Sequence, residues 1–136
     1  RATACSAQLR HRTNAIKTRC TAFLLSDFRV PEADRKRFEE SLKSASGKHD
    51  VVGIRVYDRR DAELPDVGIV EVEDAETGRK LWIDTSLRAV RERYGAAWRE
   101  GERFVDTALN RGRVDHVSVT TDEDYVNALI KLFKRR

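Results

Sequence analysis

Two aspartates follow apolar runs that are typical of buried strands. Asp27 stands just after residues 21–25 (TAFLL), and Asp58 closes residues 51–57 (VVGIRVY). A third oxygen donor, Thr3, lies at the start of the segment that leads into the first run. Because α/β folds place their sites at the carboxyl ends of parallel strands, we expect these side chains on one edge of a sheet. Clustered carboxylates there could hold Mg²⁺ and position a water, which is the chemistry of phosphoryl hydrolysis.

The cysteines and histidines favour no comparable chemistry. Cys5 and Cys20 are too few for a disulfide framework and match no zinc pattern, so we expect both to be reduced, small and buried. A nucleophilic cysteine needs a paired histidine, and His11, His49 and His116 show no pattern that provides one. The three histidines also lack metal-ligand spacing.

The elements that must position the two aspartates form a strand–helix–strand unit over residues 20–58. The first apolar run lacks alternation, which predicts a strand covered on both faces. Pro31 begins a helix that ends by residues 44–47, and Phe38 and Leu42 face the core at i,i+4 spacing. A short helix between two buried strands predicts parallel strands joined by a right-handed crossover.

The other segments complete a series of alternating strands and helices. Alternating residues on both sides of an acidic turn predict a β-hairpin. An apolar stripe at helical spacing predicts a long helix that Thr85 or Ser86 caps and Gly112 stops. A further strand and a helix that starts at Thr121 follow. The predicted ranges are 3–18 for an N-terminal helix, 67–73 and 80–85 for the hairpin, 85–112 for the long helix, 114–120 for the strand and 121–136 for the last helix.

The alternating elements indicate an α/β fold with a mostly parallel sheet and flanking helices, and the length indicates a single domain. The chain has 136 residues, of which 37% are charged, so its surface must be densely charged. No apolar run approaches the ~18 residues of a membrane span and no signal peptide is visible, so we expect a cytoplasmic protein. Methionine is absent even at position 1, and we therefore expect the chain to begin inside a longer protein.

The net charge of +4 raises nucleic acid as a possible ligand. However, 27 basic residues face 23 acidic ones, and the two kinds are interspersed rather than segregated. The aromatic residues lie in apolar stripes and not among the basic runs, so no stacking platform for bases is indicated. Solvated helix faces explain most of this charge.

Six stretches, taken in order, are similar to those of a known bacterial family. They resemble the C-terminal half of a domain-of-unknown-function family that has a von Willebrand factor A-like fold and is encoded beside MoxR-type AAA+ ATPases. The resemblance covers nearly the whole chain, and its specificity comes from the set rather than from any single motif. The stretches are residues 23–28 (FLLSDF), 49–58 (HDVVGIRVYD), 63–68 (ELPDVG), 74–78 (DAETG), 83–85 (IDT) and 121–126 (TDEDYV).

The resemblance implies a Rossmann-like sheet with a metal-ion-dependent adhesion site at its carboxyl edge. In that family site, hydroxyls, carboxylates and waters hold a divalent cation, usually Mg²⁺, and one position stays open for a partner's carboxylate. Asp27 matches the third-loop Asp of the family, and Thr3 is the best match for its second-loop Thr. The Asp-x-Ser-x-Ser loop has no counterpart, so the resemblance implies an N-terminally truncated sheet and an incomplete site. We expect Mg²⁺ in the full-length protein and none in this chain.

The resemblance implies one function, and the two aspartates by themselves suggest a second of a different class. The first is a non-enzymatic interaction module, the C-terminal part (residues 1–136) of one von Willebrand A-like domain. It would dock a protein partner, a MoxR-type AAA+ ATPase, through the edge at Asp27, with the hairpin of residues 67–85 as a second surface. The second is a metal-dependent phosphoryl hydrolase that uses Asp27 and Asp58. A truncated sheet would also expose an edge strand, through which we expect the chain to associate.

Overall fold

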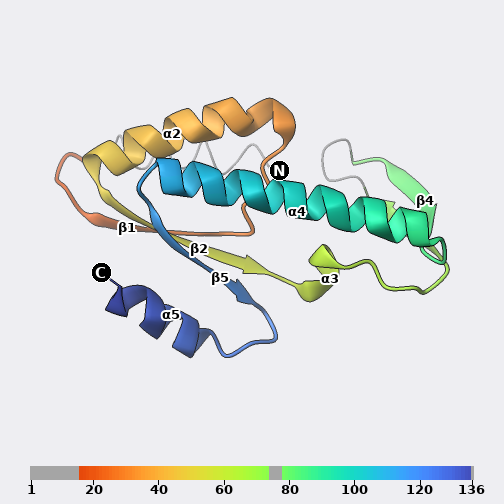
Figure 1. The fold of residues 1–136 in the computed structure, drawn as a ribbon. Helices are drawn as coiled ribbons and strands as arrows, with labels where there is room; N and C mark the ends of the chain where they lie inside the picture. Colours follow the sequence, from red (N-terminus) through yellow and green to blue (C-terminus); the bar gives the residue numbers. More distant parts are fainter. Residues whose placement is uncertain (1–15, 74–77, 136) are drawn as a thin grey trace.

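The computed structural model describes residues 16–73 and 78–135 (Figure 1). They form a mixed α/β fold with a three-stranded sheet and a separate two-stranded hairpin. The helix predicted over residues 3–18 lies almost wholly outside the described residues, and so does Thr3. Residues 16–18, the end of that predicted helix, are not helical, so the prediction is wrong there.

The predicted strand–helix–strand unit is confirmed. Strands β1 (Thr21–Ser26) and β2 (Asp50–Tyr57) pair in parallel, in a register that joins Thr21 to Asp50 and Ser26 to Arg55. The short 3-10 helix η1 (Glu32–Asp34) and helix α2 (Arg35–Lys48) connect them. The carboxyl ends of β1 and β2 therefore lie on one edge of the sheet, which is the arrangement predicted for Asp27 and Asp58.

Strand β5 (Asp115–Thr120) joins the other side of β2, also in parallel, so the order is β1-β2-β5. The central position of β2 explains why half of its eight residues are buried. It also explains Gly53, because a Cβ there would lie only 3.2 Å from the His116 Cβ on β5.

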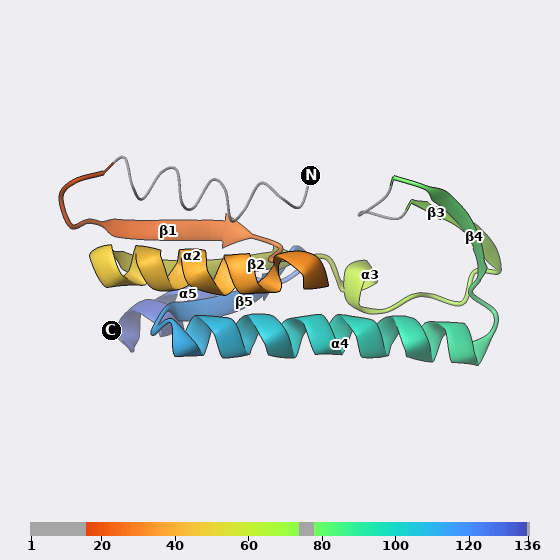
Figure 2. The same ribbon diagram turned by 90° about the horizontal axis from the view of Figure 1, so that it is seen from above.

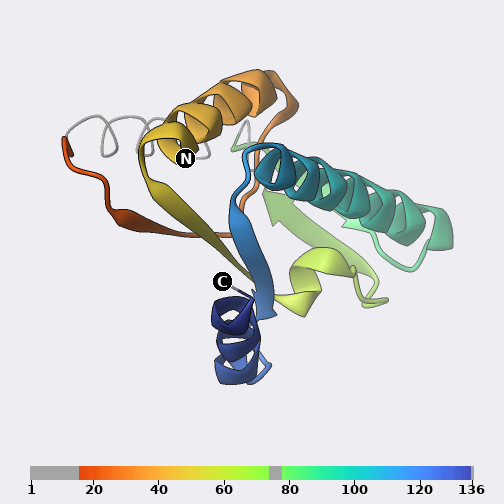
Figure 3. The same ribbon diagram turned by 60° about the vertical axis from the view of Figure 1, so that its left-hand side comes forward.

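Helices cover the two faces of the sheet unequally. Helix α2 and the long helix α4 (Arg88–Arg111) lie together on one face, and helix α5 (Tyr125–Lys134) lies on the other, as Figure 3 shows. The hydrophobic core fills the space beneath α2 and α4. Its members with less than 3% exposure include Phe28, Phe38, Leu42, Val105 and Leu109.

One face of β1 is more exposed than predicted. We expected this strand to be covered on both faces, but exposed and partly buried residues alternate along it. Phe23 is 50% exposed and Leu25 is 65% exposed. The reason is that α5 packs mainly against β5, and an edge-on ring contact between Phe133 and Phe23 (6.1 Å between centroids) is the aromatic contact that reaches β1.

The predicted hairpin is confirmed as antiparallel strands β3 (Ile69–Glu73) and β4 (Lys80–Asp84). It lies away from the main sheet, beside the N-terminal end of α4 (Figure 2). Fully buried Thr85 fastens its base, because its hydroxyl donates to the Gly68 carbonyl (2.6 Å) and accepts from the Val67 N–H (3.0 Å). Gly68 has a φ of +81°, a conformation that suits glycine.

Several predicted helix ends are wrong by a few residues. Helix α4 begins at Arg88 after Leu87, which gives no side-chain cap, because Thr85 is committed to the hairpin. Helix α5 begins four residues after Thr121, and its cap is Asp124, whose carboxylate accepts from the Val126 N–H. Helix α3 (Arg59–Ala62), a single turn, was not predicted.

The C-terminal end of α4 also differs from the prediction. Gly112 follows the helix with an ordinary φ of −73°, and the next residue, Arg113, takes the left-handed conformation with a φ of +53°. The chain therefore reverses into β5 at an arginine rather than at the glycine. Across residues 16–73 and 78–135, none of the helices has the length and apolar character needed to cross a membrane.

Candidate functional site

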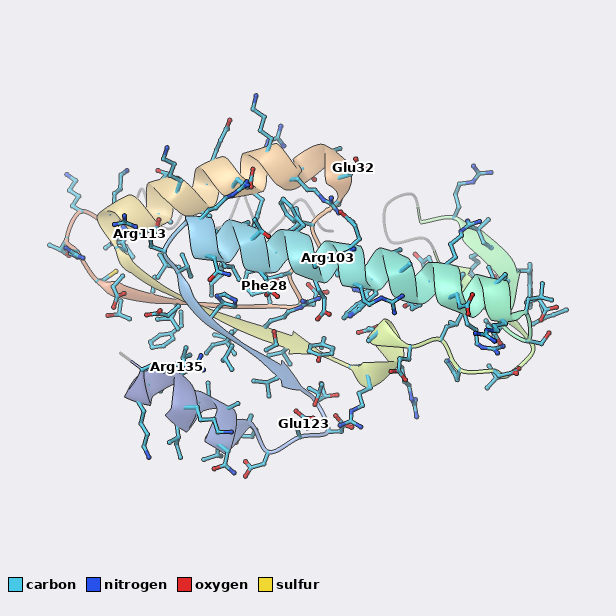
Figure 4. The ribbon with its side chains drawn as sticks, viewed as in Figure 1. Phe28, Glu32, Arg103, Arg113, Glu123 and Arg135 are labelled. Carbon is cyan, nitrogen blue, oxygen red and sulfur yellow. The ribbon has the colours of Figure 1, made fainter. Side chains whose placement is uncertain are left out.

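The carboxyl edge of the sheet gathers three loops. Residues 27–29 follow β1, residues 58–62 follow β2, and residues 121–124 follow β5. Figure 4 labels Phe28 in the first of these loops and Glu123 in the third. Both predicted edge aspartates, Asp27 and Asp58, lie in this set.

The loop after β1 is fixed by its own side chains. The Phe28 N–H donates to the Ser26 hydroxyl (3.0 Å), and the Arg29 N–H donates to the Asp27 carboxylate (3.3 Å). Phe28 has a φ of +52°, which is a strained conformation for a bulky residue, and its ring is 2% exposed within the core. Burial of this ring holds the turn in place and leaves the Asp27 side chain 54% exposed at the edge.

Arg29 joins the first loop to the second. Its guanidinium lies 2.8 Å from an Asp61 carboxylate oxygen and 3.9 Å from Asp27. It also lies 5.3 Å from the centre of the Trp98 ring on α4, within range of a cation–π contact. One side chain thus contacts both flanking loop carboxylates and the long helix.

Arg59 joins the second loop to the third. Its guanidinium lies 3.2 Å from Asp122 and 3.0 Å from Glu123. The hydrogen bond to Glu123, followed by the charge of Asp122, raises the pKa of Arg59 above its ordinary value. Asp58, next to it, accepts the Arg60 N–H at 2.8 Å and so caps α3. The three loops therefore present alternating, mostly exposed charges along one edge.

Beneath this edge lies a buried arginine that the sequence analysis did not single out. The Arg55 side chain is 6% exposed, and it pairs with Glu102 of α4 at 3.0 Å. Its guanidinium lies 5.1 Å from the Trp98 ring centre and 5.4 Å from that of Tyr57. Its Nε atom has no hydrogen-bond partner among the described residues. An arginine inside an otherwise apolar strand, VVGIRVY, was the signal that could have revealed it.

The residues of the edge do not fit a magnesium site. The Asp27 carboxylate already accepts hydrogen bonds from its own loop and lies near Arg29, whose positive charge opposes a cation there. Within the described ranges, no three His, Cys, Asp or Glu side chains are grouped so that they could hold a metal ion. Thr3, the second ligand that the resemblance implies, lies outside those ranges.

A shallow hollow of about 380 Å³ lies between α3 and the first half of α4. Its charged lining is mixed, with three arginines and two glutamates. Arg88 pairs with Glu92 at 2.7 Å, and Arg91 donates to the Thr85 carbonyl at 2.6 Å, so two of the arginines are held by neighbouring groups.

At the opposite, amino edge the structure brings together a cysteine and a histidine. The Cys20 sulfur lies 3.5 Å from the His49 Nδ1 atom. The sequence analysis missed this pair, because 29 residues separate the two and only the parallel pairing of β1 with β2 makes them neighbours. It also predicted a buried Cys20, whereas the residue is partly exposed.

The fold and this edge define an α/β protein with a short parallel sheet, a detached hairpin and a charged carboxyl edge. The family described as "Protein of unknown function DUF58" matches residues 1–103, and the chain belongs to that family. This supports the resemblance to a domain-of-unknown-function family.

The chain is similar to mycobacterial proteins. It is 32% identical over 122 residues to the uncharacterised protein MAV169 of Mycobacterium avium, a match that covers 88% of this chain and 68% of that protein. It is 33% identical over 122 residues to the uncharacterised proteins Rv1480 of Mycobacterium tuberculosis and Mb1516 of Mycobacterium bovis. The match covers 88% of this chain and only 36% of each of those two. No solved structure matches the chain significantly.

Proposed function

We propose that this chain is part of a von Willebrand A-like interaction module that docks a protein partner at the carboxyl edge of its sheet. The observation that carries the proposal is the row of ion pairs that ties the three edge loops together through Arg29 and Arg59. Charges held in place by neighbours form a fixed electrostatic pattern, which favours specific recognition and fast association. The resemblance described above makes a MoxR-type AAA+ ATPase the partner, in a cytoplasmic setting.

The way the acidic groups are used favours docking over hydrolysis. Asp58, one of the two carboxylates that a hydrolase would need, caps α3. Asp27 lies beside the guanidinium of Arg29, with 3.9 Å between its Oδ2 atom and Nε. A phosphoryl hydrolase remains the alternative, and turnover of generic phosphoesters in the presence of Mg²⁺ or Mn²⁺ would establish it.

The basic surface gives nucleic acid little support as a ligand. Arg35, Arg88 and Arg111 each pair with a glutamate. Guanidiniums that are already paired with carboxylates gain less from phosphate contacts, because the existing pair must first be broken. The charge of the helix faces is therefore better explained by local pairing.

A pull-down of the full-length protein with the ATPase tests the proposal, in Mg²⁺ and in EDTA. We expect Arg59→Ala and Asp27→Ala each to reduce recovery by about fivefold, or ~1 kcal/mol. The matched control is Asp115→Ala, which removes a carboxylate at the opposite edge of the sheet. Equal recovery of all four proteins would remove the edge from the docking surface. A loss that is confined to Asp27→Ala and seen only in Mg²⁺ would indicate docking through a metal.

A further inference from the structure

Cys20 and His49 form a side-chain pair far from the docking edge. The sulfur and Nδ1 atoms are 3.5 Å apart, within hydrogen-bonding range for sulfur. Cys20 is partly exposed, while His49 is 3% exposed. Cys20 is thus the more accessible member of the pair, and the imidazole is buried. This is the arrangement of a nucleophile with an adjacent general base.

Backbone hydrogen bonds fix both members of the pair. The Cys20 carbonyl accepts the Asp50 N–H at 2.9 Å, at the start of the β1–β2 pairing. His49 is the C-cap of α2, and its N–H donates to the Ala45 carbonyl at 2.8 Å. The two side chains are thus held together by the sheet and by the helix end, and not by loop conformations.

His49 can accept the proton of the Cys20 thiol, because its Nδ1 atom lies within hydrogen-bonding range of the sulfur. The thiolate that remains is the reactive form of cysteine.

From this geometry we propose that Cys20 is a site of oxidative modification, activated by His49, and that its substrate is a hydroperoxide. The sulfur attacks one peroxide oxygen, so that an S–O bond forms and the O–O bond breaks. The proton that His49 received from the thiol passes to the departing oxygen, which leaves as water or an alcohol. Cysteine is oxidised to sulfenic acid and the peroxide is reduced, with no other reactant.

The experiment compares the same cysteine in the folded and in the urea-unfolded chain. The intact protein is treated with hydrogen peroxide, sulfenic acid is trapped with dimedone, and labelling is followed by mass spectrometry. Trypsin places the two cysteines on separate peptides, residues 2–10 and residues 20–29, so each thiol is read independently. We expect Cys20 in the folded chain to react at least about tenfold faster than Cys20 in urea. Equal or slower reaction in the folded chain would overturn the proposal.

A substitution then assigns the effect to the histidine. His49→Gln keeps a polar side chain but removes the base, and we expect it to abolish the advantage of the folded chain. A folded His49→Gln protein that keeps the full rate would overturn the role of His49. If circular dichroism shows that this variant is unfolded, the comparison of the native chain with and without urea still decides the reactivity of Cys20. A Cys5→Ser variant should retain the Cys20 rate, and loss of that rate would contradict activation by His49 alone.

Discussion

Arg55 and Glu102 form an ion pair that links the central strand to the long helix, with 3.0 Å between the guanidinium Nη1 atom and the carboxylate Oε1 atom. The arginine side chain is 6% exposed and the glutamate side chain 32% exposed. Trp98 and Tyr57 flank the guanidinium. The pair therefore fixes α4 on the sheet directly beneath the charged edge.

Removing the glutamate should be more costly than removing an exposed one. Glu102→Ala leaves the buried guanidinium without its counter-ion, and we expect a loss of about 2–3 kcal/mol in the free energy of unfolding, less than for a fully buried pair. Urea denaturation measures this change. Glu92→Ala, which breaks the exposed pair with Arg88, is the control, with an expected loss of about 0.5 kcal/mol. Similar losses for both variants would show that burial does not strengthen the Arg55 pair.

Arg113 is a site at which glycine should stabilise the protein. Its φ of +53° costs an L-residue about 1–2 kcal/mol, and the side chain is exposed. We expect Arg113→Gly to raise the free energy of unfolding by about 0.5–1 kcal/mol, since part of the relieved strain is offset by chain entropy. The control is Arg103→Gly, an exposed position within α4, which should lower stability by about 1 kcal/mol. Both arginines are labelled in Figure 4. Destabilisation by both substitutions would contradict strain at Arg113.

The pair of Arg35 and Glu100 should make stability depend on pH. Two contacts of 2.6 Å join the guanidinium to the carboxylate, and the hydrogen bond from Arg35 holds the pKa of Glu100 below its usual value of 4.5. A lowered carboxyl pKa stabilises the folded state above the ordinary pKa, and this stability is lost as the pH falls through the folded-state pKa. The melting temperature of Glu100→Gln should therefore lie below that of the wild type at neutral pH. The two should converge in acid below pH 4.5, and a constant difference would contradict this linkage.

The exposed face of β1 predicts self-association. Leu25 is 65% exposed on a strand at the edge of the described sheet, so two copies could pair through this strand or bury its apolar face. We expect sedimentation to show concentration-dependent association of the chain, which Leu25→Lys weakens. Leu87→Lys, at an exposed leucine beside α4, should have no effect. A wild-type chain that stays monomeric at every concentration would refute this prediction.

The parallel strand pair could be predicted because its signals are local. Apolar runs, a proline at a helix start and i,i+4 core residues all lie within residues 20–58. The bare face of β1 could not be predicted in this way, because it depends on α5 packing against β5 rather than β1. The cap of α4 was misassigned for a similar reason, since Thr85 bonds to Gly68 across the hairpin.

The carboxyl edge of the sheet shows the same difference between local signals, which can be read from the sequence, and long-range contacts, which cannot. Strand ends in the sequence were enough to place Asp27 and Asp58 on one edge. The bridging roles of Arg29 and Arg59 depend on loops that meet only after the strands have paired. Helix α3 escaped prediction because its four residues are too short to show periodicity.

Thr85 has a mechanical consequence. Its hydroxyl joins Val67 and Gly68, before β3, to the segment that leads into α4, which is 24 residues long and so rises about 36 Å along its axis. Near the C-terminal end of α4, Val105 and Leu109 are buried in the hydrophobic core. Because α4 is one continuous helix, a displacement of β3 and β4 would be passed along it to the residues that pack in the core beside the sheet.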